Sequence, residues 1–233
     1  MSGQPHPSLV RTLAVVPAYN ETDTIGSVIE GTRAYVDEVA VVDDGSRDET
    51  ASIARDHGAT VLEHTFNTGV GGAVRTGYRY AIDAGFDLVV QVDADGQHEP
   101  SQIPKLLAAA EDADMVIGSR YLNDSHEEYS LVRSAGITFF TGLVNTLGGV
   151  AITDVTSGFR VYRVSMLESI LHHSDKHWAV EQTLEAARRG YTISEVSTEI
   201  PTRETGQSQF DLETFVLYPL RMAEVSLRVL LFR

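Results

Sequence analysis

The segment Asp87-Leu-Val-Val-Gln-Val-Asp93-Ala-Asp95-Gly-Gln97-His98 joins a short apolar run to a cluster of polar side chains. A run of this length that is rich in β-branched residues predicts a strand buried on both faces of a parallel sheet. Ligands bind beyond the carboxyl ends of the strands in such sheets. The polar residues that end this run are therefore the first candidates for a functional site.

The same alternation of apolar runs and helical patterns continues on both sides of this segment. In the first half we expect strands at 9–16, 38–43, 60–64, 87–93 and 114–119, with helices at 22–35, 48–57, 71–84 and 100–110. In the second half we expect helices at 131–147, 164–172 and 178–189 and strands at 159–162 and 191–199. This order predicts an α/β domain, Rossmann-like, whose mostly parallel sheet carries helices on both faces.

Composition excludes several classes of protein. The chain has 233 residues, no cysteine, and 18 basic against 33 acidic residues, which gives a net charge of −15. Thiolate metal sites, disulfide scaffolds and thiol nucleophiles are therefore excluded, and the acidic balance argues against a nucleic-acid partner. Only Lys105 and Lys176 are lysines, and an acidic, lysine-poor surface suits a halophilic cytosol.

No segment has the length expected of a membrane span. No run of about 18 uncharged apolar residues occurs, and residues 1–8 are polar, which predicts neither a transmembrane helix nor a secretory signal. We expect a catalytic domain over 1–209 and a helical segment over 210–233. Apolar residues recur at helical spacing in that segment, so it either lies on a membrane surface or packs on the core or a partner.

Asp93 and Asp95 form the strongest local motif. Two carboxylates two residues apart at a strand end can converge on a hard divalent cation, and Gln97 offers a third oxygen. Mg²⁺ or Mn²⁺ bound there would keep open positions for phosphate oxygens. Aspartate and glycine after a strand are also ordinary turn formers, so the pair by itself leaves a purely structural role open.

Two other expected strands also end in polar residues. Tyr19 and Glu21 follow the first, where an aromatic face and a carboxylate suit a nucleobase, although either residue alone is more readily explained by a structural role. Asp43 and Asp44 end the second, and adjacent buried acids are costly without a ligand, water or donor. A ribose or base contact is one reading of the pair, and a turn capped by Ser46 is the other.

The glycines and arginines of two further segments suggest a phosphate environment. Residues 67–73, Asn-Thr-Gly-Val-Gly-Gly-Ala, lack the spacing of a dinucleotide fingerprint, so we interpret them as close loop packing near a nucleotide. Arg160 and Arg203 each lie close to a glycine and a hydroxyl residue, Ser208 in the case of Arg203. The planar guanidinium suits phosphate oxygens, and an ion pair on an acidic surface is the alternative.

The ordered set of motifs resembles family 2 glycosyltransferases with the GT-A fold, most closely the dolichyl-phosphate mannose or glucose synthase type. The resemblance covers roughly residues 10–210 and rests on six motifs in order. They are Pro17-x-Tyr-Asn-Glu21, Val42-Asp-Asp-Gly-Ser46, Asp93-x-Asp-x-Gln-His98, Gly118-Ser-Arg-Tyr121, Ser157-Gly-Phe-Arg160 and Arg203-x-x-Gly-x-Ser208.

The resemblance implies an inverting, metal-dependent transfer of glucose or mannose from UDP-glucose or GDP-mannose to dolichyl or polyprenyl phosphate, feeding protein glycosylation at the cytoplasmic face of the membrane. It assigns roles to three groups of residues. The nucleoside would be held by Pro17, Tyr19, Glu21, Asp43 and Asp44. The metal would be held by Asp93, Asp95 and Gln97. Donor or acceptor phosphates would meet Arg120, Arg133, Arg160, Arg203 and Ser208, with Asp95 and Arg203 as the catalytic residues.

The chain departs from the family pattern at two positions, and other functions stay open. Gly96 stands where relatives commonly have leucine, and Gln209 stands where they often have a lysine that would meet the acceptor phosphate. The main alternative is a soluble family 2 transferase with a sugar or protein acceptor. A nucleotidyltransferase and a non-catalytic nucleotide-sugar binding module are more distant alternatives.

Overall fold

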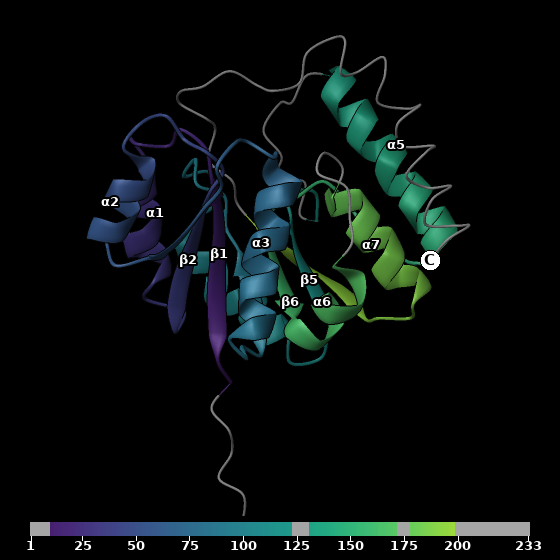
Figure 1. Ribbon diagram of the computed structural model, residues 1–233. Helices are drawn as coiled ribbons and strands as arrows, with labels where there is room; N and C mark the ends of the chain where they lie inside the picture. The colour runs from purple at the N-terminus through teal and green to yellow at the C-terminus, as the bar shows by residue number, and fades with distance from the viewer. Residues whose placement is uncertain (1–9, 123–130, 172–177, 199–233) are drawn as a thin grey trace, which may run out of the picture.

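The computed structural model describes residues 10–122, 131–171 and 178–198, with only the backbone for 131–135 (Figure 1). Over these ranges the chain forms one seven-stranded sheet in the order β3-β2-β1-β4-β6-β5-β7. The strands are β1 (Thr12–Ala18), β2 (Glu38–Asp43), β3 (Thr60–Glu63), β4 (Leu88–Gln91), β5 (Met115–Ser119), β6 (Arg160–Arg163) and β7 (Ile193–Ser197).

Helices cover both faces of the sheet. They are α1 (Ile25–Thr32), α2 (Thr50–Asp56), α3 (Val70–Asp83), the 3₁₀ turn η1 (Pro100–Gln102), α4 (Ile103–Ala109), α5 (Leu131–Gly148), α6 (Val164–Ile170) and α7 (Trp178–Arg188). The apolar faces of α1, α2 and α4 share one core cluster. Those of α3, α5, α6 and α7 share the other, and α3 crosses in front of the strands in Figure 1.

The two cores follow from the alternation of side chains along the strands. In β1, Leu13 and Val15 point into the core under α3, whereas Ala14 and Val16 point into the core under α1, and all four are completely buried. Burying a side chain of this size contributes roughly 1.5–3 kcal/mol. Continuous apolar strands are therefore what a sheet covered on both faces requires.

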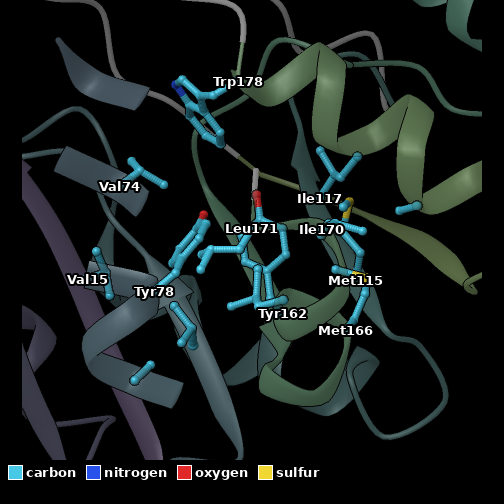
Figure 2. Close-up of a cluster of buried hydrophobic side chains, with 14 of the residues drawn as sticks. Val15, Val74, Tyr78, Met115, Ile117, Tyr162, Met166, Ile170, Leu171 and Trp178 are labelled. Carbon is cyan, nitrogen blue, oxygen red and sulfur yellow. The ribbon is translucent and has the colours of Figure 1, made fainter. Parts of the chain in front are cut away.

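Aromatic and aliphatic side chains from distant parts of the chain fill the core under α3 (Figure 2). Tyr78 from α3 and Tyr162 from β6 meet edge to face, with ring centroids 5.2 Å apart. Around them pack residues of β1, β5, α6 and α7. This core therefore joins the two halves of the described chain into one body.

The predicted fold class is confirmed, and the observed elements fall within a few residues of the expected ones. The expectation that 210–233 is helical and the division at residue 209 concern residues outside the described ranges, and they stay predictions. Within those ranges no helix is both long enough and apolar enough to cross a bilayer.

Strand β6 is antiparallel to both of its neighbours, β4 and β5, whereas every other strand pair described is parallel. Because β6 runs backwards, it begins at the edge where β1, β2, β4 and β5 end. Gln91 of β4 faces Arg160 of β6, so the register continued by two residues puts Asp93 opposite Gly158. The segment before β6 is thereby brought to the edge where the candidate residues lie.

Candidate active site

Asp93 and Asp95 lie in the turn that follows β4, as predicted. The turn closes when Asp95 Oδ1 accepts a hydrogen bond from the backbone N–H of Gln97, at 3.0 Å. Gly96 has a φ of +75°, a conformation that leucine would adopt only with strain. The glycine that departs from the family pattern therefore adopts this tight turn without strain.

The backbone of Gly158 makes room for the carboxylate of Asp93. A Cβ atom at position 158 would lie 2.9 Å from Asp93 Oδ2, closer than real Cβ contacts come, and 3.0 Å from Asp93 Oδ1. The side chain of Asp93 is still 38% exposed. It is therefore held against the start of β6 on one side and open to a ligand on another.

The donor set at this turn fits a hard divalent cation. Asp93, Asp95 and Gln97 offer carboxylate and amide oxygens, which are the ligand types of Mg²⁺ and Mn²⁺. In the part of the chain that the structure describes, no group of three or more His, Cys, Asp or Glu side chains gathers at one point. A cation held by two carboxylates and an amide keeps coordination positions for phosphate oxygens.

The loop after β1 is tied to the loop after β2. Asn20 has a φ of +56°, its N–H donates to Ser46 Oγ at 2.9 Å, and its Oδ1 accepts from the N–H of Arg47 at 2.9 Å. The N–H of Glu21 donates to Thr50 Oγ1 at 2.8 Å. These bonds present Tyr19, which is 40% exposed, at the edge of the sheet.

The residues predicted to hold the nucleoside differ in exposure. Tyr19 and Glu21 are accessible, whereas Pro17 is buried within β1, opposite Val42. Asp43 is buried, and its Oδ1 accepts hydrogen bonds from the N–H and the hydroxyl of Ser46. Direct contact of these residues with a nucleoside stays a prediction.

Asp44 organises the segment that precedes α3. Its Oδ1 lies 2.7 Å from His64 Nδ1 and accepts from the N–H and hydroxyl of Thr68, at 2.9 and 2.8 Å. Its Oδ2 accepts from the N–H of Gly69 at 2.8 Å. Asp44 is almost fully buried, so these contacts give it a loop-shaping role beside the predicted nucleoside contact.

The close loop packing interpreted for residues 67–73 is confirmed at Asn67, and the nearby nucleotide stays a prediction. Gly45 has a φ of +74°, and a Cβ there would lie 2.9–3.0 Å from the backbone of Phe66 and Asn67. The loops after β2 and β3 therefore touch backbone to backbone. Only glycine allows both this conformation and this approach.

Arg120, at the end of β5, is clamped by Asp154. Its Nε and Nη2 donate to the two carboxylate oxygens at 2.6 and 2.9 Å, and Nη2 also donates to Thr156 Oγ1 at 2.8 Å. Burial tends to raise the pKa of Asp154, but the hydrogen bonds and charge of Arg120 outweigh it and lower that pKa. The bidentate pair fixes the plane of the guanidinium, and phosphate binding by Arg120 stays a prediction.

Glu195 of β7 holds the turn that carries Asp154. Its Oε2 accepts from the N–H of Thr153 at 2.7 Å, and its Oε1 accepts from the N–H of Asp154 at 2.9 Å. Burial raises the pKa of Glu195 against the opposing effect of these hydrogen bonds. A chain of contacts therefore runs from β7 through Asp154 to Arg120.

The structure contradicts the prediction that Arg160 binds phosphate. Its side chain is completely buried, and its guanidinium donates to the carbonyl oxygens of Ser157, Val155 and Ala179 and to Thr183 Oγ1, at 2.6–3.2 Å. It also lies over the ring of Trp178, 5.4 Å from the centroid. Arg160 therefore ties the start of β6 to α7 and does not face a ligand.

Three predicted phosphate ligands cannot be placed. Arg133 lies in α5 at a position where only the backbone is described, and Arg203 and Ser208 lie outside the described ranges. Conversely, sequence reasoning missed His64, Asp154 and Glu195 altogether. Single acidic residues in an acidic chain do not stand out as site residues, and neither does a single histidine. The partners of these three residues are also distant in sequence.

The comparisons with known proteins agree with this geometry. The model of the family described as Glycosyl transferase family 2 matches residues 13–171. The undecaprenyl-phosphate mannosyltransferase of Micrococcus luteus is 34% identical, with 86% of this chain and 87% of that protein covered. The dolichyl-phosphate hexose transferase of Haloferax volcanii is 32% identical, with 84% and 85% covered.

The fold is likewise that of a solved glycosyltransferase. The crystal structure of glucosyl-3-phosphoglycerate synthase from Mycobacterium tuberculosis, in complex with Mn²⁺, UDP and phosphoglyceric acid, superposes with a TM-score of 0.68 at 20% identity. The match covers 94% of this chain and 76% of that one. Sequence and fold together show that the chain belongs to glycosyltransferase family 2 and is a glycosyltransferase with the GT-A fold.

Proposed function

We propose that this glycosyltransferase moves a hexose from a nucleotide diphospho-sugar to a polyprenyl or dolichyl phosphate, with inversion at the anomeric carbon. The observation that carries the proposal is the pair Asp93 and Asp95 at the end of β4, with Asp93 seated against Gly158. The names of the Micrococcus and Haloferax relatives support the lipid phosphate as acceptor. Glucose from UDP-glucose and mannose from GDP-mannose are the two donors that we propose to test.

In this proposal Asp93, Asp95 and Gln97 hold Mg²⁺ or Mn²⁺ on the diphosphate of the donor. The cation supplies neutralisation of the charge that develops on the departing nucleoside diphosphate. The M. tuberculosis enzyme of the same fold was crystallised with Mn²⁺ and UDP, which supports this assignment. Tyr19 offers its exposed ring to the base, and Glu21 offers a carboxylate to its polar edge.

The acceptor in this scheme needs little activation. A phosphate monoester is already ionised at neutral pH, so its oxygen attacks without a strong general base. Cationic side chains are required instead to gather the phosphates of donor and acceptor. We assign that task to Arg120, Arg133 and Arg203, with Ser208 beside Arg203.

A lipid-linked acceptor puts the reaction at a membrane surface, and we propose its cytoplasmic face. One observation besides the apolar spacing of 210–233 supports this. Helix α5 is uncharged from residue 134 to its end at Gly148, although the chain as a whole carries −15. On that helix Phe139 is 57% exposed. An uncharged helix face with an exposed aromatic residue suits the headgroup region of a bilayer.

The test is a transfer assay that separates chloroform-soluble from aqueous product, with each labelled nucleotide sugar and polyprenyl phosphate. We expect label in the organic phase, and we expect Asp95→Asn to lose at least about 100-fold in rate because it removes an anionic ligand from a charge-neutralising site. Asp83→Asn is the matched control, since Asp83 is an exposed residue of α3 that pairs with Arg79.

Three outcomes would contradict parts of the proposal. Label confined to aqueous product would favour the soluble transferase with a sugar or protein acceptor. Wild-type activity that persists in excess chelator would contradict the proposed dependence on a metal ion. Full activity of Asp95→Asn would remove Asp95 from the site.

A further inference from the structure

His98 lies directly behind Asp93 and contacts it twice. The imidazole Nδ1 accepts a hydrogen bond from the backbone N–H of Asp93 at 3.0 Å. The other ring nitrogen, Nε2, lies 3.6 Å from Asp93 Oδ2. The side chain of His98 is 4% exposed, compared with 38% for Asp93. The histidine is therefore an interior partner of the aspartate, and the aspartate lies between it and solvent.

The first contact decides where the proton of the neutral ring resides. A nitrogen that accepts a hydrogen bond carries no proton, so in neutral His98 the proton is on Nε2. This N–H lies on the side of the ring that is near Asp93 Oδ2. The distance of 3.6 Å from Nε2 to Oδ2 is too long for a hydrogen bond. The Nε2–H group therefore acts on the carboxylate as a nearby dipole.

The orientation of the ring is itself fixed by β6. The imidazole stacks on the ring of Phe159, with centroids 4.7 Å apart and planes 14° apart. Phe159 is buried and directly follows Gly158, whose missing Cβ makes room for the Asp93 carboxylate. Two adjacent residues at the start of β6 therefore hold both the carboxylate of Asp93 and the histidine behind it.

These contacts limit the ways in which Asp93 can turn. Its backbone N–H is bonded to Nδ1, one of its oxygens lies near Nε2, and both of its oxygens lie where a Cβ at position 158 would collide with them. Partners of this kind orient the ligands of a metal and are nearly as important as the ligands themselves. The bond from the Asp93 N–H to Nδ1 also closes the turn, whereas the position of Nε2 beside Oδ2 concerns the carboxylate itself.

We infer that His98 is a positioning residue that aims the carboxylate of Asp93 at the divalent cation, with the ring braced by Phe159. The inference rests on the metal assignment of the proposed function, and it adds a role that neither the two aspartates nor Gln97 fills. It predicts that the nitrogens of His98 act on cation affinity and leave the nucleoside contacts alone.

The test measures the dissociation constant of Mn²⁺ by calorimetry on the whole chain with saturating UDP. UDP affinity without metal and the melting temperature without metal are measured beside it. His98→Phe keeps a ring against Phe159 and removes both nitrogens. We expect it to weaken Mn²⁺ binding at least about tenfold, the range for partners of metal ligands, and to leave metal-free UDP affinity unchanged.

Two further variants separate positioning from packing. His98→Asn keeps an acceptor near the position of Nδ1, so we expect it to recover part of the Mn²⁺ affinity. His57→Phe is the matched control, because His57, at the end of α2, likewise has one ring nitrogen at a backbone group, the carbonyl oxygen of Ile53, and the other near a carboxylate, that of Glu30. We expect wild-type Mn²⁺ affinity from it.

Each result decides the matter. Wild-type Mn²⁺ affinity in His98→Phe would overturn the inference and leave the proposed function intact, as would a parallel loss of Mn²⁺ and UDP binding that asparagine does not rescue. A wild-type chain that binds no Mn²⁺ in the presence of UDP would overturn the metal assignment itself. If His98→Phe does not fold, His98→Asn is compared with His98→Gln, which lacks an acceptor at the position of Nδ1. Tighter Mn²⁺ binding by His98→Asn supports the inference, and equal binding by the two variants overturns it.

Discussion

The guanidinium of Arg160 donates hydrogen bonds to four oxygen atoms of the protein, three of them backbone carbonyls. Those carbonyls belong to the segment before β6 and to α7, which come from different parts of the chain. A buried carbonyl left without its donor costs about 1–3 kcal/mol, and bonds to a charged donor are at the strong end. Arg160 therefore stabilises the edge at which Gly158 meets Asp93.

We predict that Arg160→Lys lowers the free energy of unfolding by at least about 3 kcal/mol, because an ammonium group cannot reach four acceptors in this planar arrangement. Urea denaturation followed by circular dichroism measures it. Arg79→Lys is the control, since Arg79 is exposed on α3 and its ion pair within the described residues is an i,i+4 contact with Asp83. Wild-type stability of Arg160→Lys together with weakened phosphate binding would contradict this argument and support phosphate binding by Arg160.

At the scale of elements, the contact between β7 and the turn that precedes β6 contains two carboxylates, Glu195 and Asp154, whose pKa values shift in opposite directions. Asp154 pairs with Arg120, and its pKa lies below the usual value. Glu195 is partly buried beside backbone N–H groups, and desolvation holds its pKa above the usual value. Lowering the pH from neutrality should therefore protonate Glu195 first and leave the pair of Arg120 and Asp154 in place.

We predict the sign of two stability effects from these shifts. The stability due to Asp154 is present above the pKa of an unfolded aspartate and is lost as pH falls through its lowered folded pKa. The folded pKa of Glu195 lies above that of an unfolded glutamate, so its ionisation costs stability at neutral pH, and this cost is relieved as pH falls below the folded pKa. Carboxylate ¹³C NMR titration and unfolding at several pH values measure both. A Glu195 that titrates below Asp154 would contradict the argument.

The elements themselves could be predicted because each apolar run or helical period is local. The strand Glu38–Asp43 was predicted to the residue, and α3 and β5 within one residue at either end. The reversed direction of β6 could not be predicted, because four alternating residues read alike in both directions. That reversal brings Gly158 to Asp93, so the contact between the Asp93 carboxylate and this glycine could not be predicted either.

The candidate site was predictable where residues follow a strand directly and unpredictable where two loops meet. Asp93, Asp95 and Tyr19 lie at strand ends, as the apolar runs before them indicated. The nucleoside contact of Asp44 stays a prediction. Its bonds to Thr68, Gly69 and His64 could not be predicted, because their approach depends on β2 and β3 being neighbours. Pairing of loops is a property of the whole sheet, and no local pattern encodes it.

The charge of the whole molecule bears on how it meets a membrane. A net charge of −15 repels anionic lipid, and the repulsion is screened to about 3 Å in molar salt. The segment 210–233 carries three acidic and three basic residues, so removing it leaves the net charge at −15. A change in membrane binding on its removal would therefore report apolar contact and not charge.

We predict that the whole chain floats with liposomes in molar salt and that a chain ending at Gln209 floats less. The physical reason is that Leu212, Phe215 and Leu227, with other apolar residues at helical spacing, add apolar area to the uncharged face of α5. Phe139→Ser in the whole chain tests the share of α5, and we expect a partial loss of flotation from it. Circular dichroism must show that the shortened chain is folded. Equal flotation of the two chains, both folded, would remove the anchoring role from 210–233 and would leave packing on the core or on a partner as the role of that segment.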